Sequence, residues 1–254
     1  MAELYAKTLK VSDLDVSIRR TMYSLLELYY DCTDWHRFNA DLDAKDAVII
    51  LFDRSMHRLR GFSTLKNAEV ARADGTLCRA IYSGDTVVEK AYWGQKVLGV
   101  EFLKYLWVQK IKRPFQPLYW FLISKGYKTY LLMANNFETH YPRYEAETPS
   151  EMKRLLDDIG THFFPGHYQA ESGLIEFESS LGQLKEGIAE VGDLKTVTHP
   201  RIKYFDDVNP RWREGVELAC IAEMTFLMPL RYGIKKAWEQ RIRPLLPARL
   251  HAGP

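Results

Sequence analysis

The stretch CRAIYSGDTVVEKAYWGQKVLGVEFL, residues 78–103, decides the fold. Its first half belongs to an apolar segment, Leu77 to Val88, that predicts a strand. Glu89 to Trp93 forms a short turn, and a helix opens at Gly94. A strand that leads directly into a helix, with Gly94 and Gly99 on either side of the first turn, leaves backbone N–H groups available to a phosphate. The stretch therefore predicts a phosphate-binding turn in an α/β domain.

The predicted strand is interrupted by three consecutive polar or small residues, Ser83, Gly84 and Asp85. Such an interruption predicts a β-bulge, or a point where another group approaches the backbone. A carboxylate within an apolar strand is uncommon, although a bulge that faces solvent accounts for it equally well.

The neighbouring segments predict the rest of the sheet. A strand, turn and strand over residues 46–70 precede the tight turn Asp74-Gly75, so the strand from Leu77 is expected to pair antiparallel with the one before. The other predicted elements are a helix from Leu14 to Tyr30, a strand from Pro117 to Ser124 and a helix from Gly126 to Phe137. This order predicts an α/β (α+β) class with a mixed, mostly antiparallel sheet flanked by helices.

The pattern changes after residue 145. We therefore expect one domain over residues 1–145 and a C-terminal extension, 146–254, that packs on the same domain. The extension is expected to hold a helix over 151–159, an aromatic loop over 162–168, a helix over 181–191, a loop over 197–210 and a basic amphipathic helix over 232–246.

Composition narrows the function classes. The net charge of the 254 residues is only +2, so it makes no general case for a nucleic-acid partner. The three cysteines are scattered and predict neither a disulfide framework nor a zinc site, and His162 and His167 are badly spaced for a shared metal. The N-terminus lacks a secretory signal and no apolar window is long enough to span a bilayer. These features favour a cytoplasmic protein without a metal.

The order of elements, together with the turn over residues 94–99, resembles the GNAT acyltransferase superfamily. The run VIILFDRSMHRLRGFSTL is similar to the family's second and third strands, and TVVEKAYWGQKVLGVEFL to its fourth strand and the following turn. Family members commonly carry Arg or Gln, two variable residues, Gly, one variable residue, then Gly or Ala. A motif started at Gln95 places Leu98 and Val100 at the small-residue positions. The resemblance covers about residues 10–145.

The resemblance implies a donor, an acceptor and a set of site residues. The donor is an acyl-CoA or acyl carrier protein thioester, and the acceptor an amine or hydroxyl of a small molecule. The extension over 146–254 would shape the acceptor pocket. The backbone amides that would hold the pyrophosphate belong to Gly94, Gln95, Lys96, Val97, Leu98, Gly99 and Val100. Tyr130, preferred over Tyr127, is the implied acid for the departing thiolate. Asp85 is the implied base, with Glu89 in reserve.

Two other functions stay open. One is a catalytically idle domain that binds an acyl ligand or a protein partner, and the other is an unrelated α/β enzyme that uses Asp85, His140 and His167. A basic rim on the helix after Gly94 would suit adenosine phosphates or an acidic carrier protein, although a solvated helix face is the ordinary explanation. It consists of Lys104, Lys110, Lys112 and Arg113. The basic C-terminal helix has the composition for peripheral membrane contact.

Overall fold

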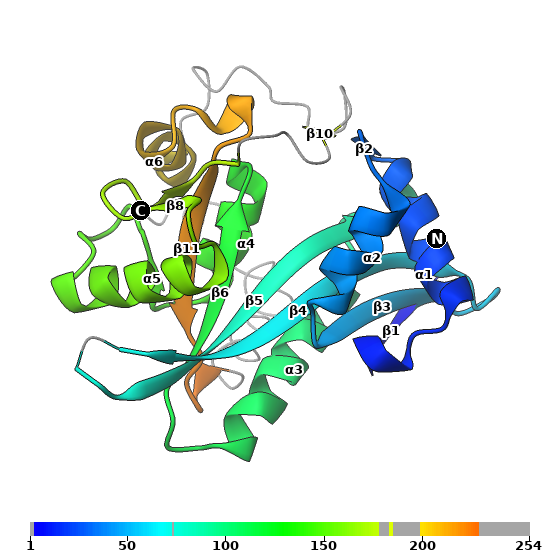
Figure 1. Ribbon diagram of the computed structural model, residues 1–254, viewed down its shortest axis with the longest axis horizontal. Helices are drawn as coiled ribbons and strands as arrows, with labels where there is room; N and C mark the ends of the chain where they lie inside the picture. The colour runs from blue at the N-terminus through cyan, green and yellow to red at the C-terminus, as the bar shows by residue number, and fades with distance from the viewer. Residues whose placement is uncertain (1–2, 73, 178–182, 185–198, 229–254) are drawn as a thin grey trace, which may run out of the picture.

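The computed structural model describes residues 3–72, 74–177, 183–184 and 199–228, which form a large sheet covered by helices and a separate two-stranded sheet (Figure 1). The helices are α1 (Val16–Glu27), α2 (Trp35–Asp43), α3 (Val97–Lys112), α4 (Tyr127–Asn136), α5 (Ser150–Phe163) and α6 (Pro200–Val208). The long strands are β1 (Leu4–Lys10), β3 (Ala47–Asp53), β4 (Leu59–Ala71), β5 (Leu77–Val88), β6 (Leu118–Ser124) and β11 (Glu217–Glu223). The short ones are β2 (Tyr30–Asp31), β7 (His140–Tyr141), β8 (Tyr168–Gln169), β9 (Leu174–Ile175) and β10 (Gln183–Leu184).

The main sheet has the strand order β1-β3-β4-β5-β6-β11-β9-β8, with β7 paired to β11. Every pair found in the described residues is antiparallel except β5 with β6. The expected antiparallel meander, crossover helix and following strand are therefore present as β3-β4-β5, α3 and β6. The predicted fold class is confirmed.

Helices cover both faces of the sheet. On one face α1 and α2 pack over β3 and β4 through residues such as Phe38, Ile50 and Phe62, and α5 packs over β6 and β11. On the other face α3, α4 and α6 enclose a core that includes Ile49, Trp120 and several further aromatic side chains. Burial on both faces explains why β3 and β6 read as continuous apolar runs instead of alternating ones.

The N-terminal elements differ from the prediction in two respects. The first helix begins at Val16 instead of Leu14, because the Asp15 carboxylate caps it by accepting a hydrogen bond from the Ile18 N–H at 2.8 Å. Residues 4–10, to which the sequence assigned no element, form the edge strand β1 on β3. This strand extends the meander by one strand before the first helix.

The C-terminal part corrects several expectations. Residues 200–208 form helix α6, with proline in its first turn, where a loop was predicted. Helix α5 continues to Phe163, so His162 is helical and not in the predicted loop. Gln183 and Leu184 pair with β2 as a strand where a helix was predicted. The remainder of that predicted helix and the basic helix over 232–246 lie outside the described residues.

Residues 217–223, to which the sequence assigned no element, form β11, which pairs antiparallel with β6 and extends the sheet beyond the predicted strands. Within the described part of the chain, no helix is long and apolar enough to cross a membrane.

Candidate functional site

The interruption in β5 is a bulge, as its residue types predict. Ser63 faces Thr86 and Leu65 faces Ser83, so Gly84 and Asp85 together stand opposite the single residue Thr64. Pairing of β5 with β6 ends at Ser83. Beyond this point the two parallel strands diverge (Figure 1). The bulge therefore marks the place where the sheet opens.

The glycine turn follows at the end of β5. Gly94 has φ +83°, which favours glycine because other residues meet steric strain there. Helix α3 then begins at Val97, and its N-cap Lys96 supplies no side-chain hydrogen bond within the described residues. A Cβ added at Gly94 or Gly99 would meet no heavy atom within 4 Å. The turn consequently presents backbone N–H groups and the positive end of a helix dipole to open space.

The other residues of the predicted phosphate-binding segment follow the same turn. Gln95 and Lys96 lead into the helix, and Val97 and Leu98 pack in part against Leu4, Leu51 and Tyr92. Val100 is 52% exposed. All seven residues are thus partly buried or exposed at the same helix end. Two of their N–H groups already have partners, since Gln95 N–H bonds to the Tyr92 carbonyl at 3.3 Å and Val100 N–H to the Lys96 carbonyl at 3.0 Å.

A buried carboxylate supports the turn from behind. Asp53 accepts hydrogen bonds from Tyr92 Oη at 2.9 Å and from the Ser55 N–H and hydroxyl at 2.7 and 2.6 Å. These bonds, the Ser55 hydroxyl first, hold the pKa of Asp53 well below its ordinary value. Glu89, the reserve base, forms an ion pair with Arg60 at 2.8 Å. The segment before Gly94 is therefore anchored to β3 and β4.

This network predicts an acid-dependent loss of stability. Asp53 has a lowered folded-state pKa, so its contribution is complete above the unfolded pKa of about 3.9 and disappears as pH falls toward the folded value. We expect the Tm to fall below about pH 4, and more steeply in the wild type than in Asp53→Asn, which has no such group to protonate. Calorimetric Tm values measured from pH 6 to pH 2 on both proteins test this. Parallel curves would contradict it.

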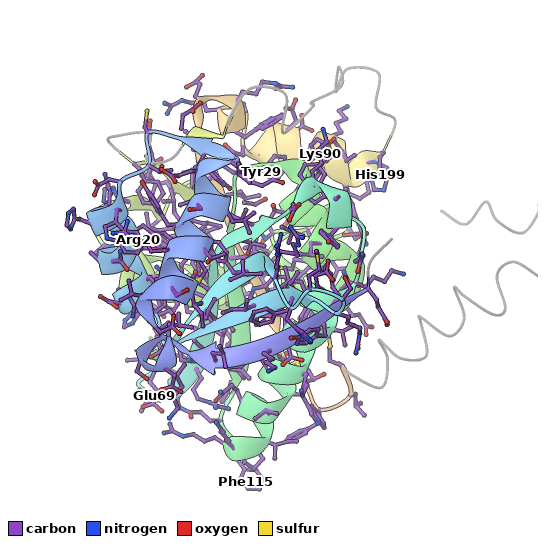
Figure 2. All side chains as sticks on the ribbon, turned by 90° about the vertical axis from the view of Figure 1, so that its right-hand side faces the viewer. Arg20, Tyr29, Glu69, Lys90, Phe115 and His199 are labelled. Atoms are coloured by element: carbon purple, nitrogen blue, oxygen red, sulfur yellow. The ribbon has the colours of Figure 1, made fainter. Side chains whose placement is uncertain are left out.

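Beside the turn lies a cavity of about 320 Å³. It is lined mainly by apolar and aromatic side chains together with the backbone of the turn: Leu4, Tyr29, Tyr30, Leu51, Thr86, Val87, Val88, Tyr92, Trp93, Gly94, Gln95 and Leu98. Tyr29 closes one side, because its hydroxyl accepts a hydrogen bond from the Lys90 N–H at 2.6 Å. Figure 2 shows Tyr29 and Lys90 near the same end of the molecule. The cavity joins the end of β5 to the start of α3.

Two carboxylates with raised pKa values lie next to this region. Asp85 keeps contact with solvent, yet the surrounding protein atoms, and after them the Asp41 carboxylate, raise its pKa to about 6. Burial raises the pKa of Glu217 on β11 to about 7, and Asp85 adds to the shift, while Lys125 at 3.6 Å opposes it. Each therefore titrates near neutral pH, in the range suited to a general base.

Tyr30 connects the cavity to the two carboxylates. It lines the cavity. Its pKa is raised to about 12 by burial first and then by Asp85 and Glu217. The same causes raise the pKa of Tyr82. Asp85, Glu217, Tyr30 and Tyr82 thus belong to one electrostatically coupled group at the opening of the sheet.

An ion pair between Lys45 and Asp41, at the C-terminal end of α2, completes this group. Lys45 is bonded to Asp41 at 2.7 Å, and its side chain is only 7% exposed. Lys45 also approaches Gly84 closely: if Gly84 had a Cβ, that atom would lie 3.2 Å from Cε of Lys45. The pair packs directly against the bulge, so it fixes the charge environment of Asp85.

Tyr130 is placed elsewhere. It is buried on the face covered by α3, α4 and α6, packs against Phe205 at 5.7 Å and donates a hydrogen bond to the Pro142 carbonyl at 3.3 Å. Asp85 interacts instead with Asp41 and Lys45 of the α2 region on the other face. The structure does not bring the predicted acid and base together.

Asp85, His140 and His167, the site residues of the alternative enzyme hypothesis, have different neighbours in the structure. His140 is buried with its Nδ1 2.8 Å from the Phe137 carbonyl, and His167 Nδ1 lies 3.2 Å from the Glu176 carbonyl. The described residues contain no group of three or more His, Cys, Asp or Glu side chains arranged to hold a metal ion.

The residues that sequence reasoning missed are Tyr30, Asp41, Lys45, Lys125 and Glu217. Glu217 carried a usable signal, because it is a carboxylate in an apolar strand, the criterion that singled out Asp85. Tyr30 and Lys125 carried none, since neither stands in an unusual local pattern.

The arrangement now decides the kind of fold. The elements follow one another in the order expected from the resemblance: N-terminal helices, an antiparallel meander, a glycine turn, a long helix and a further strand. This last strand, β6, runs parallel to β5 and then diverges from it. The fold is GNAT-like. No family model and no curated protein sequence matches the chain.

Several solved structures match the chain at low identity and low TM-score. A probable N-acyltransferase from Enterococcus faecalis matches at 14% identity and a TM-score of 0.40, over 54% of this chain but only 34% of that protein. An acetyltransferase from Trypanosoma brucei matches at 16% identity and 0.40, over 56% and 96%. NAA60 from Arabidopsis thaliana, solved with a bisubstrate analogue, matches at 16% and 0.38, over 54% and 84%. These three matches cover 54 to 56% of this chain.

Proposed function

We propose that the protein transfers an acyl group from an acyl-CoA thioester to a primary amine. The observation that carries the proposal is the pair of near-neutral carboxylates, Asp85 and Glu217, beside a cavity that opens at the exposed N-terminus of α3. A base of this pKa and an anion-binding helix end are the two functions that such a transfer needs.

The donor would be held by the glycine turn and the cavity. Its pyrophosphate fits the backbone N–H groups between Gly94 and Gly99, where open space in front of both glycines admits a bulky anion. The apolar and aromatic wall next to the turn suits the pantetheine arm and the acyl chain. The thioester carbonyl would then reach the point where β5 and β6 diverge.

The reaction is a direct transfer. The acceptor binds as an ammonium ion. Asp85, with Glu217 as its partner carboxylate, takes one proton from it, and the free amine nitrogen attacks the thioester carbon. The tetrahedral intermediate collapses with cleavage of the carbon–sulfur bond. The thiolate of CoA takes a proton from Tyr30, which lines the cavity and is coupled electrostatically to both carboxylates. The second nitrogen proton, lost as the amide forms, replaces the proton that Tyr30 gave up, and Asp85 releases its own proton to solvent. The products are an amide and CoA, and both groups regain their starting protonation states.

The acceptor side favours a cationic compound. The carboxylates of Asp41, Asp85 and Glu217 outnumber the ammonium groups of Lys45 and Lys125 in this group. A protonated amine is attracted to such a site more than an alcohol is. Glu217 comes from beyond residue 145, so we propose that the C-terminal part of the chain helps to shape the acceptor pocket.

The proposal is tested by the release of CoA thiol from acetyl-, butyryl- and palmitoyl-CoA in the presence of a panel of primary amines, with products identified by mass spectrometry. An acylated amine formed in proportion to thiol supports the transfer. Binding of acyl-CoA without turnover for any amine or alcohol would instead identify an idle domain. Acylated alcohols alone would reject the amine acceptor.

Tyr30 and Tyr130 give a direct test of the acid. Tyr30→Phe is expected to lower kcat by about 10²-fold or more at an unchanged Kd for acyl-CoA, because the thiolate loses its proton donor. Tyr130→Phe removes one buried hydrogen bond to the Pro142 carbonyl and is expected to lower stability with kcat within a few-fold of the wild type. Stopped-flow and thermal denaturation measurements on both variants decide the matter. The reverse ranking of kcat values would return the role to Tyr130.

A further inference from the structure

A second cavity, of about 270 Å³, lies between the C-terminal half of α3 and the start of β5. Its walls come from β4, β5, α3 and β6: Asn67, Ala68, Glu69, Arg79, Ala80, Ile81, Gln109, Lys112, Arg113 and Leu118. Figure 2 places Glu69, with Phe115 below it, at the end of the molecule opposite Tyr29 and Lys90. Along α3, Val97 and Gln109 are roughly 18 Å apart at 1.5 Å per residue. The second cavity is therefore separate from the glycine turn.

The cavity is cationic. Arg79, Lys112 and Arg113 line it, with Glu69 as the one carboxylate among the lining residues, and Glu69 is already paired with Arg113. Lys110 adds a further charge nearby, with its Nζ 3.0 Å from the Gln116 carbonyl. Burial and the neighbouring Arg113 lower the pKa of Arg79, and burial and Arg79 lower that of Lys110. The positive charges in this region thus repel one another.

Arg79 has unused hydrogen-bonding capacity. The residue is 9% exposed, its Nη2 donates to the Arg113 carbonyl at 3.3 Å, and its buried Nε has no acceptor within the described residues. A guanidinium that only capped the end of α3 would account for the Nη2 bond but would leave the buried Nε without a partner. An anion bound in the cavity would give this guanidinium further oxygen acceptors.

We propose that this cavity binds the phosphate group of a small phosphorylated ligand. A phosphate accepts several charge-assisted hydrogen bonds at once, and arginine presents the planar donor geometry that fits it. Lys112 and Arg113 stand at the solvent side of the cavity, where they can attract the anion and cover it. A ligand here would join β4, β5, β6 and α3 at the closed end of the diverging strands. The inference does not depend on the proposed acyl transfer.

The first probe is inorganic phosphate, added to the full chain and compared with NaCl at equal ionic strength. We expect phosphate to raise the Tm above the NaCl control and to give saturable heat in calorimetry. The double variant Lys112→Gln/Arg113→Gln, which changes exposed side chains and retains the fold, should weaken phosphate binding at least tenfold. Lys104→Gln, on the same helix but outside the cavity, should leave it within twofold.

Two results would overturn the proposal. One is an equal effect of phosphate and NaCl, which would leave Arg79 as a structural cap of α3. The other is phosphate binding that survives Lys112→Gln/Arg113→Gln but is abolished by Gly99→Glu, which would place the anion at the glycine turn. Titration of the same variants with CoA separates the two sites, because the double variant is expected to bind CoA as the wild type does.

Discussion

Asp85→Asn is expected to lower kcat/KM for the acyl-transfer reaction by about 10²- to 10⁴-fold, with the Kd for acyl-CoA unchanged. The amide keeps the size of the side chain but cannot accept a proton from the attacking amine. A base acts only when deprotonated, so kcat/KM of the wild type should rise with pH through about 6, the pKa of Asp85. Because Glu217 is coupled to it, the apparent value belongs to the pair.

The controls for Asp85 separate chemistry from charge and stability. Glu217→Gln should also lower kcat/KM and move the apparent pKa of the rate profile, since one member of the coupled pair is lost. Asp207→Asn changes an exposed aspartate on α6 and should leave the profile unaltered. If Asp85→Asn retained the wild-type rate and pH profile, neither carboxylate could be assigned the base role on this geometry.

Gly99→Glu is expected to weaken acyl-CoA binding on the order of 100-fold. A carboxylate about 5 Å from the pyrophosphate costs roughly 3 kcal/mol at an effective dielectric constant of 20. The same carboxylate lies in the first turn of α3, where negative charge favours the helix dipole, so the folded state should keep its stability. Isothermal titration with acetyl-CoA, together with thermal denaturation, measures both quantities on one sample.

Two substitutions at the same position isolate the charge. Gly99→Gln has the size of glutamate without its charge and should lose much less affinity than Gly99→Glu. Gly99→Ala places a Cβ where no heavy atom lies within 4 Å, and alanine favours a helix over glycine by about 1 kcal/mol, so it should raise the Tm with little loss of affinity. Equal affinity of the Glu and Gln variants would mean that the pyrophosphate does not bind at this turn.

Local patterns in the sequence were sufficient to predict most of the helices and strands up to Phe137. The meander, the glycine turn and the bulge at Gly84 and Asp85 depend on nearest neighbours, on alternation and on the conformational freedom of glycine, and the structure confirms them. Errors appeared where tertiary contacts override local preference. Residues 4–10 become a strand because β3 offers an open edge, and α6 forms because Phe205 has a core to enter.

The candidate site could be predicted only in part. Asp85 was found because it breaks a local pattern, and the Gly94 to Gly99 turn because its glycines flank a helix start. Tyr130 was preferred because it lies in the middle of its helix, yet in a helix of 3.6 residues per turn that position faces the core, where its hydroxyl bonds to Pro142. No local rule distinguishes a tyrosine that faces a cavity from one that faces the core.

By itself the sequence determined where strands, turns and helices form, and which residues could carry a proton or leave room for a phosphate. Only the tertiary structure decided which of these groups meet. Tyr30, Asp85 and Glu217 come from three distant segments, and their pKa values depend on burial and on charges contributed by other segments. Desolvation and Coulomb interactions act through space, so near-neutral carboxylates arise only once the sheet has brought β5 and β11 to either side of β6.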